Sequence, residues 1–145
     1  MHVESRIALE MNALLQQHDS PEHWEYPRDF DRATEGRDFA AFLMDLETAL
    51  GQRLPVETGA HIQDASFHSQ IGLLGGALRF SNFGRMIAFT PDAEIAEEMA
   101  RTVRQLAATH GYVLVPTSDL ETLYPREEGL RLGIRTWWIR YFDYL

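Results

Sequence analysis

The N-terminal third of the chain carries two apolar stripes at helical spacing, separated by a polar loop. Between residues 5 and 18 the apolar positions recur every three or four residues, as they do in an amphipathic helix. A second stripe of this kind covers residues 37–50 and is followed by Gly51, a residue type that commonly ends helices. Pro21 and Pro27 bracket the loop between them. We therefore predict two helices, 5–18 and 37–50.

The pattern changes to a period of two in the middle of the chain. Apolar and polar residues alternate over residues 65–73, which is typical of a half-buried strand. The Gly75-Gly76 pair marks a turn, and two short apolar runs follow at 77–81 and 85–89. The Asn82-Phe83-Gly84 sequence between these runs marks a second turn. These features predict three strands in an antiparallel meander.

A helix and then a strand are predicted for the next segment. The Thr90-Pro91-Asp92 sequence offers a capping residue, a proline suited to the first helical position and an acid for the first turn. A helical apolar stripe follows and ends before the His110-Gly111 pair. The apolar run 112–116 then predicts a strand.

The last twelve residues, 134–145, are the most aromatic part of the chain, and their periodicity fits either a strand or a helix. Their β-branched and aromatic composition favours a strand. Large apolar side chains on both faces of that strand favour a position inside the sheet. We expect Trp138 and Phe142 to lie in the core. Asp143 is expected either to pair with an arginine, such as Arg140 or Arg135, or to lie exposed near the chain end.

The order of these elements predicts an α+β fold in a single domain, residues 1–145. We expect an antiparallel sheet of about four to five strands. Two N-terminal helices and one helix between strands are expected to pack on this sheet.

The net charge of the chain indicates which classes of molecule it can bind. The 145 residues carry a formal net charge of −9, with 22 acidic residues against 13 basic ones. Residues 1–50 hold 11 acids and four arginines, so most of the excess negative charge lies in the first third. Phosphate binding requires accumulated cations, so we expect no nucleic acid among the partners. A basic protein partner fits this charge better.

Other features exclude several kinds of chemistry. The chain has no cysteine, which removes disulfides, thiol catalysis and cysteine-based metal sites. The first residues lack the apolar run of a signal peptide, and no apolar stretch approaches the ~20 residues that span a bilayer. We expect a cytoplasmic protein that does not interact with membranes.

A metal or catalytic site finds little support in the pattern. His61, Asp64 and His68 are suggestive, but in a strand the two histidines point to opposite faces. Asp64 and His68 would share a face about 13 Å apart. No nucleophile elbow and no phosphate-binding glycine loop is present. We therefore expect no metal, no cofactor and no enzymatic activity; a small hydrolase that uses a histidine or a carboxylate remains a less favoured alternative.

The loop PEHWEYPRDFDR, residues 21–32, interleaves acids with aromatic residues. Aromatic side chains supply anchors at protein interfaces and acids supply electrostatic steering, so this composition suits a binding surface. The alternative is that Trp24 and Phe30 only pin the loop to the core. The candidate partner-binding residues lie in this loop and on the polar face of the second helix: Glu22, Trp24, Glu25, Tyr26, Asp29, Asp31, Asp38 and Asp45.

Three segments together carry a family resemblance. The sequences DASFH (64–68), LRFSNFG (78–84) and TWWIRYFDYL (136–145) make the chain similar to small immunity proteins of bacterial polymorphic-toxin systems. The resemblance covers roughly residues 60–90 and 130–145, under half of the chain. It implies a protein that binds a cognate toxin domain, delivered by contact-dependent or type VI secretion, and that neutralises the toxin by direct stoichiometric inhibition. The acidity then fits a basic toxin, such as a nuclease.

A different kind of interaction protein is the main alternative. The chain would then be a non-toxin interaction module or a homodimeric regulator, with the aromatic tail as a strand edge for pairing. The sequence leaves open the oligomeric state and the identity of the toxin.

Overall fold

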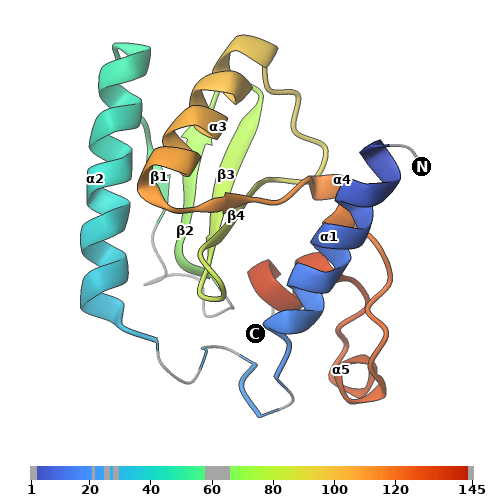
Figure 1. The fold of residues 1–145 in the computed structure, drawn as a ribbon. Coiled ribbons are helices and arrows are strands. Elements are labelled where there is room, and N and C mark those ends of the chain that lie inside the picture. Colours follow the sequence, from blue (N-terminus) through green and yellow to red (C-terminus); the bar gives the residue numbers. More distant parts are fainter. Residues whose placement is uncertain (1–2, 21, 25–26, 28–29, 58–65, 144–145) are drawn as a thin grey trace.

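The computed structural model describes residues 3–20, 22–24, 27, 30–57 and 66–143. The helices are α1 (Val3–Gln17), α2 (Arg32–Leu50), α3 (Glu97–His110), α4 (Thr117–Leu120), α5 (Glu127–Arg131) and the π-helical turn η1 (Ile139–Asp143). The strands are β1 (Val56–Glu57), β2 (Ser66–Leu73), β3 (Gly76–Ser81), β4 (Met86–Phe89) and β5 (Val113–Leu114). The fold is α+β (Figure 1). Among the helices of this described part, none has the length and apolar character needed to cross a membrane.

The five strands form one mixed sheet in the order β1-β2-β3-β4-β5. The first three pairings are antiparallel, as the predicted meander requires. The last pairing, β4 with β5, is parallel, so the prediction of a wholly antiparallel sheet is only partly right. The reason lies in the connection: α3 crosses from the end of β4 back to the start of β5, and such a crossover returns the chain in the same direction.

The boundaries of α2 follow from its capping residues. Asp31 precedes the helix, and its carboxylate accepts hydrogen bonds from the Thr34 main-chain N–H at 3.2 Å and the Thr34 hydroxyl at 2.8 Å. Gly51 ends the helix at a left-handed φ of 70°, which glycine adopts without strain. The helix therefore begins five residues before the predicted start at residue 37, because the capping aspartate, and not the first apolar residue, sets the N-terminus.

The predicted start of the third helix at Thr90 is wrong. Residues 90–93 form a turn closed by a hydrogen bond from the Ala93 N–H to the Thr90 carbonyl at 3.1 Å, and α3 begins only at Glu97. The Thr90 hydroxyl accepts the Ala77 N–H of the neighbouring strand at 3.2 Å instead of capping a helix. Proline favours the second position of a turn as well as the first of a helix, which explains the ambiguity.

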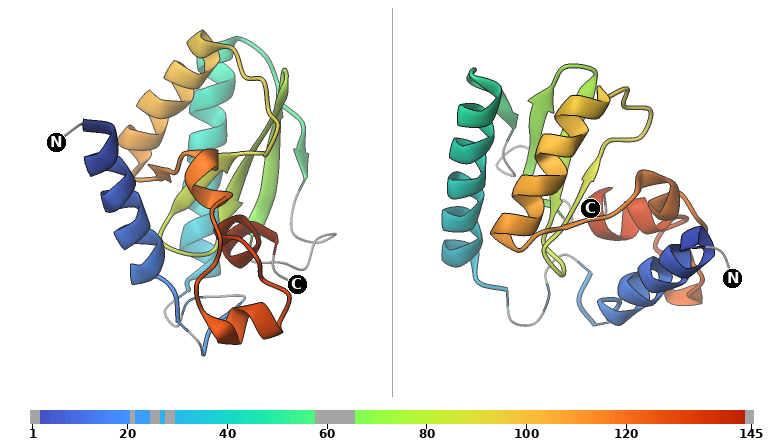
Figure 2. Two further views of the ribbon diagram at one scale, coloured as in Figure 1. Left: turned by 90° about the vertical axis from the view of Figure 1, so that its right-hand side faces the viewer. Right: turned by 45° about the horizontal axis from the view of Figure 1, so that its top comes forward.

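One face of the sheet is covered by α2 and α3, which lie side by side (Figures 1 and 2). Leu78, Phe80 and Ile87 of the sheet point into this layer. Phe80 makes edge-to-face contacts with Phe39 at 5.0 Å and with Phe42 at 5.6 Å between ring centroids. This core is the one that the period-two pattern and the second helical stripe predict.

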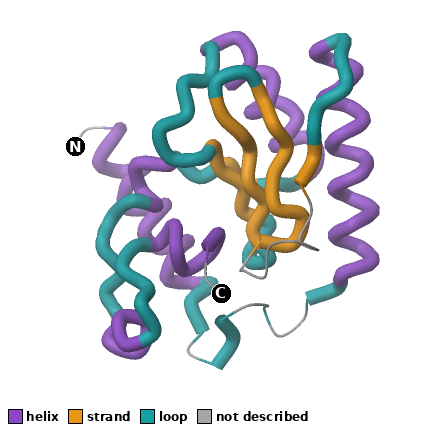
Figure 3. The backbone as a smooth tube through the Cα atoms, turned by 180° about the vertical axis from the view of Figure 1, so that it is seen from behind, coloured by secondary structure: helices purple, strands orange, loops and turns teal. Residues whose placement is uncertain are grey.

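A second core lies beside the other sheet face and contains α1 and the C-terminal segment. Met86 and Ala88, which alternate with Ile87 along β4, belong to this core. Figure 3, seen from behind, shows the C-terminal helical turn and α1 on the same side of the strands. α1 therefore packs with the C-terminal elements and not beside α2, which differs from the arrangement predicted from the sequence.

The C-terminal strand predicted for residues 134–145 is wrong, because the chain is helical from Trp137 through η1. Trp137 stacks on Tyr141, and Trp138 stacks on Phe142 with 4.7 Å between ring centroids. These pairs are four residues apart, the spacing that brings side chains together on a helix. The prediction that Trp138 and Phe142 are core residues is confirmed, since they are 6% and 0% exposed.

Candidate functional site

The start of the loop between α1 and α2 is held by a buried cation, Arg140. The Arg140 side chain is 0% exposed, and its Nε donates a hydrogen bond to the Asp19 carboxylate at 2.8 Å. Its two terminal nitrogens donate to three main-chain carbonyl oxygens of the loop at distances of 2.8–3.2 Å: those of Ser20, His23 and Trp24. A residue of the C-terminal helix thus fixes the positions of Asp19, Ser20, His23 and Trp24.

Aromatic rings complete the surroundings of Arg140. Its guanidinium carbon lies 4.6 Å from the centre of the Trp24 ring and 4.8 Å from that of Phe83. At these distances the ring faces attract the cation. Trp24 is partly buried and packs against the second core, so it does pin the loop, as the structural alternative for this residue predicts.

Asp19, the partner of Arg140, collects further donors. The Tyr124 hydroxyl donates to both carboxylate oxygens at 2.8 and 2.9 Å, and an Arg126 terminal nitrogen lies 3.7 Å from one of them. Burial, followed by the bond to Asp19, raises the pKa of Tyr124, so the phenol keeps its proton as a donor. The buried carboxylate therefore has cationic and neutral donors around it, which a charge at this depth requires.

The predicted partner-binding residues are spread over three settings. Glu22 is exposed on the loop, whereas Glu25, Tyr26 and Asp29 lie outside the described residues. Asp31 is exposed and caps α2, and the hydrogen bonds from the Thr34 side chain and main chain hold its pKa below its usual value. The structure thus keeps Asp31 ionised at the end of the loop.

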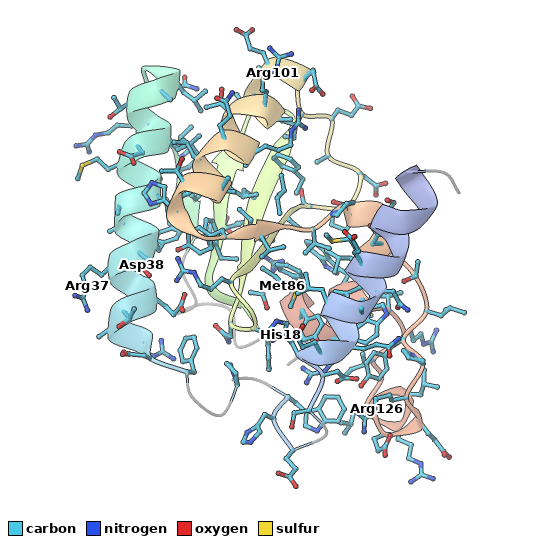
Figure 4. The ribbon with its side chains drawn as sticks, viewed as in Figure 1. His18, Arg37, Asp38, Met86, Arg101 and Arg126 are labelled. Atoms are coloured by element: carbon cyan, nitrogen blue, oxygen red, sulfur yellow. The ribbon has the colours of Figure 1, made fainter. Side chains whose placement is uncertain are left out.

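The two predicted carboxylates within α2 form intramolecular pairs. Asp38 accepts a hydrogen bond from Arg85 at 2.9 Å, and Asp45 pairs with His110 of α3 at 2.7 Å. Figure 4 shows Asp38 on α2, with Arg37 extending away from the protein at the next position. A partner that used Asp38 or Asp45 would have to share them with Arg85 and His110.

Arg85 joins the turn after β3 to both helices that cover the sheet. Besides Asp38, its guanidinium donates to the carbonyl oxygens of Gly111 at 3.2 Å and His110 at 2.8 Å, at the C-terminus of α3. A cation at this end of a helix is favoured by the helix dipole. Glu35 of α2 lies farther from Arg85, at 3.5 Å, and burial raises its pKa despite the opposing attraction of Arg85.

A surface cleft of about 330 Å³ opens between the loop, the N-terminus of α2 and the turn that carries Arg85. Its walls include Phe30 and Asp31 from the loop, Glu35 from α2 and His18 from the end of α1. Burial lowers the pKa of His18, which favours a neutral ring. The cleft thus presents carboxylates, an imidazole and an aromatic ring together.

The sequence pattern did not identify most residues of this site. Asp19 and Arg140 are 121 positions apart, and nothing in a local pattern joins them. His18 lay at the end of the helix predicted for residues 5–18, and Glu35 preceded the predicted start of the second helix at residue 37. One signal was available: a lone arginine among five aromatic residues near the chain end favours a buried cation with a distant carboxylate partner.

Comparisons of the chain with models of protein families, with curated protein sequences and with solved structures found no match. Among the residues that the structure describes, no group of three or more histidines and acids is placed to hold a metal ion. His61 and Asp64, which the sequence brought forward as ligand candidates, lie outside the described residues. The site is therefore interpreted from its own geometry and chemistry.

Proposed function

We propose that the protein binds a basic protein partner through the α1–α2 loop and the cleft beside it, and that it acts as an immunity protein. In this function it neutralises a secreted bacterial toxin by stoichiometric binding and catalyses no reaction. The family resemblance of the sequence supports the toxin as partner, and the chemistry of the cleft supports a basic surface on it.

One observation carries the proposal: an acidic loop is anchored on the protein at both ends and borders a cleft walled by carboxylates. Arg140 fixes the start of the loop, and the Asp31 cap fixes its end. Anchoring lowers the entropy that an interface loop loses when its partner binds. The exposed carboxylates of Glu22 and Asp31 then face solvent, where they can steer a basic partner.

A homodimeric regulator remains the second class of interaction protein. The sequence suggested a strand edge at the tail as the route to pairing. The structure does not offer this edge over residues 137–143, which are helical. No other observation favours self-association over a basic partner.

The test is to capture the partner and to measure inhibition. Tagged protein is exposed to lysate of the native host, washed at low and then high salt, and the retained polypeptide is assayed for toxicity with increasing inhibitor. We expect a basic toxin domain whose activity is abolished at one equivalent. Glu22→Arg should slow association by tenfold or more, whereas Glu98→Arg, the same charge change at the start of α3, should not.

Two results would contradict the proposal. A toxin that keeps its activity at several equivalents is not neutralised by stoichiometric binding. A partner that associates equally fast with Glu22→Arg and with Glu98→Arg does not use the loop.

A further inference from the structure

The cleft beside the loop has unequal charges on its walls. Arg85 is the cation among its lining residues, and it already binds Asp38 at 2.9 Å, Glu35 at the longer distance of 3.5 Å, and two carbonyl oxygens. Asp31 and Glu35 add two carboxylates to the same walls. Even with Arg85 counted, the lining and Asp38 together carry excess negative charge, which a cation entering the cleft would balance.

The placement of these two carboxylates at the start of α2 favours a particular cation. Asp31 precedes α2 and Glu35 lies one turn into it, so the two side chains offer acceptors from one wall. A planar guanidinium has five N–H donors in a fixed arrangement and can serve more than one acceptor at once, whereas an ammonium acts as a single compact charge. Burial lowers the pKa of His18 on another wall, so this ring adds no positive charge that would repel a cation.

The Phe30 ring strengthens the preference for arginine. Ring faces attract guanidinium groups and stack with them, and Phe30 lines the cleft beside the carboxylates. The chain's own Arg32 lies 6.0 Å from the centre of this ring, which is the outer limit of such contacts. The cleft thus pairs an aromatic surface with two carboxylates, the combination that suits a guanidinium.

We infer that this cleft receives an arginine side chain of the partner, held between the carboxylates of Asp31 and Glu35 and against the ring of Phe30. The inference rests on the proposed function, which it deepens by naming the chemical group recognised. It predicts that the partner's interface contains an essential arginine that lysine replaces poorly.

The experiment uses small probes, so it does not depend on the partner. Isotope-labelled protein is titrated with Nα-acetyl-L-arginine methylamide at constant ionic strength, and amide chemical shifts are followed by NMR. The matched probe is the citrulline derivative, which has nearly the same shape and no charge. We expect saturable shifts at Glu35, Gly84 and Arg85 with the arginine probe, and none there with the citrulline probe.

Two variants locate the site. Glu35→Gln should weaken binding of the arginine probe by about tenfold, the loss of one charge-assisted interaction. Asp31→Asn should weaken it as well, and asparagine is an equally good helix cap, so this second variant keeps the test decisive if Glu35→Gln folds poorly. Glu98→Gln, which removes one charge at the distant end of α3, should bind as the wild type does.

The inference is overturned if the citrulline probe produces the same shifts, if shifts scatter over all surface carboxylates, or if both cleft variants bind as tightly as the wild type. These outcomes are separable from failure of the proposed function. If the cleft binds the arginine probe but no toxin partner is found, the proposed function is rejected and the arginine site is supported. A neutralised toxin whose affinity is unchanged by Glu35→Gln and Asp31→Asn would keep the function and reject the site.

Discussion

Two arginines in this protein are bound by the same kinds of groups and differ in burial. Arg140 contacts a carboxylate at 2.8 Å, carbonyl oxygens and aromatic rings. Arg85 contacts a carboxylate at 2.9 Å, carbonyl oxygens and the Tyr112 ring at 4.3 Å. The Arg140 side chain is 0% exposed and that of its partner Asp19 is 2% exposed, whereas Arg85 and Asp38 are 29% and 39% exposed.

This difference separates a structural role from a site that can exchange partners. A buried charge has no water to replace a lost partner, so each member of the Arg140 pair depends on the other. Around Arg85, water and an incoming ligand can take over part of the solvation, and the net contribution of such a pair is small. The buried contacts of Arg140 therefore hold the start of the α1–α2 loop in place. The similar but partly exposed contacts of Arg85 allow groups in the cleft to exchange partners.

The largest effect is expected for Arg140→Met, which tests the buried side of this comparison. The variant leaves the Asp19 carboxylate buried, with Arg126 at 3.7 Å as a distant cation. We expect it to lower the free energy of unfolding by about 3–5 kcal/mol, measured by urea denaturation. The double variant Asp19→Asn/Arg140→Met should recover part of this loss, because it removes the uncompensated charge. A loss below about 1 kcal/mol would show that burial does not distinguish the two arginines.

The next effect concerns the aromatic packing of the second core. Phe142 is 0% exposed and stacks on Trp138, so Phe142→Ala opens a cavity in the second core. We expect a loss of about 3 kcal/mol in unfolding free energy, at the lower end of the range for Arg140→Met because no charge is left behind. Leu132→Ala is the control, since Leu132 is 49% exposed and its truncation should cost less than about 1 kcal/mol. Equal losses in the two variants would contradict this assignment of the core.

The first core was largely predictable because its pattern is local. The alternation over residues 65–73 and the apolar run 77–81 correspond to β2 and β3, and the stripe over 37–50 corresponds to the buried face of α2. The helix α2 has one buried and one exposed face, so the period of its pattern identifies a helix. Strand β3 is buried throughout residues 77–81 and was recognised as a short apolar run between two turn signals. The parallel pairing of β5 was not predicted, although the predicted order of strand, helix and strand is the one in which a crossover returns the chain in the same direction.

The C-terminal part of the second core was predicted wrongly because nearly every described side chain of its helix is buried. Ile134, Trp137, Trp138, Tyr141 and Phe142 leave no polar face from which a period could be read. The β-branched and aromatic composition therefore favoured a strand. The segment is helical because tertiary packing outweighs this intrinsic preference. The spacing of four residues between the aromatic pairs 137/141 and 138/142 was the better indication of a helix.

The candidate site could not be predicted from local sequence patterns for a different reason. The acidic loop was recognised from composition, but the groups that organise it come from elsewhere in the chain: Asp19 and Arg140, and Glu35 and Arg85, which are 50 positions apart. Pairings of this kind depend on the finished fold. A single sequence shows which charges need partners and does not show which partners they find.

A smaller effect is expected on the exposed side of the comparison. Arg85→Met removes the pair with Asp38 and the bonds to the end of α3. Because water can solvate the released groups, we expect a loss of about 1–2 kcal/mol in unfolding free energy. Urea denaturation of Arg85→Met and Arg140→Met under the same conditions compares the two losses of unfolding free energy directly. A loss as large as that of Arg140→Met would mean that Arg85 is as much a part of the structural core.

The smallest effect is a dependence of stability on pH that comes from His18 in the cleft. Burial lowers the pKa of His18 below its usual 6.5, so the unfolded chain binds a proton at a higher pH than the folded protein does. The stabilisation from a neutral His18 is therefore complete above pH 6.5 and is lost as the pH falls through the lower pKa of the folded state. His18→Gln should remove this part of the pH dependence in denaturation measured between neutral and mildly acidic pH. His23→Gln, in the loop held by Arg140, should retain it. If the stability of both variants depends on pH as that of the wild type does, the His18 ring is no more buried than an ordinary surface histidine. The cleft is then more open to water than its geometry indicates.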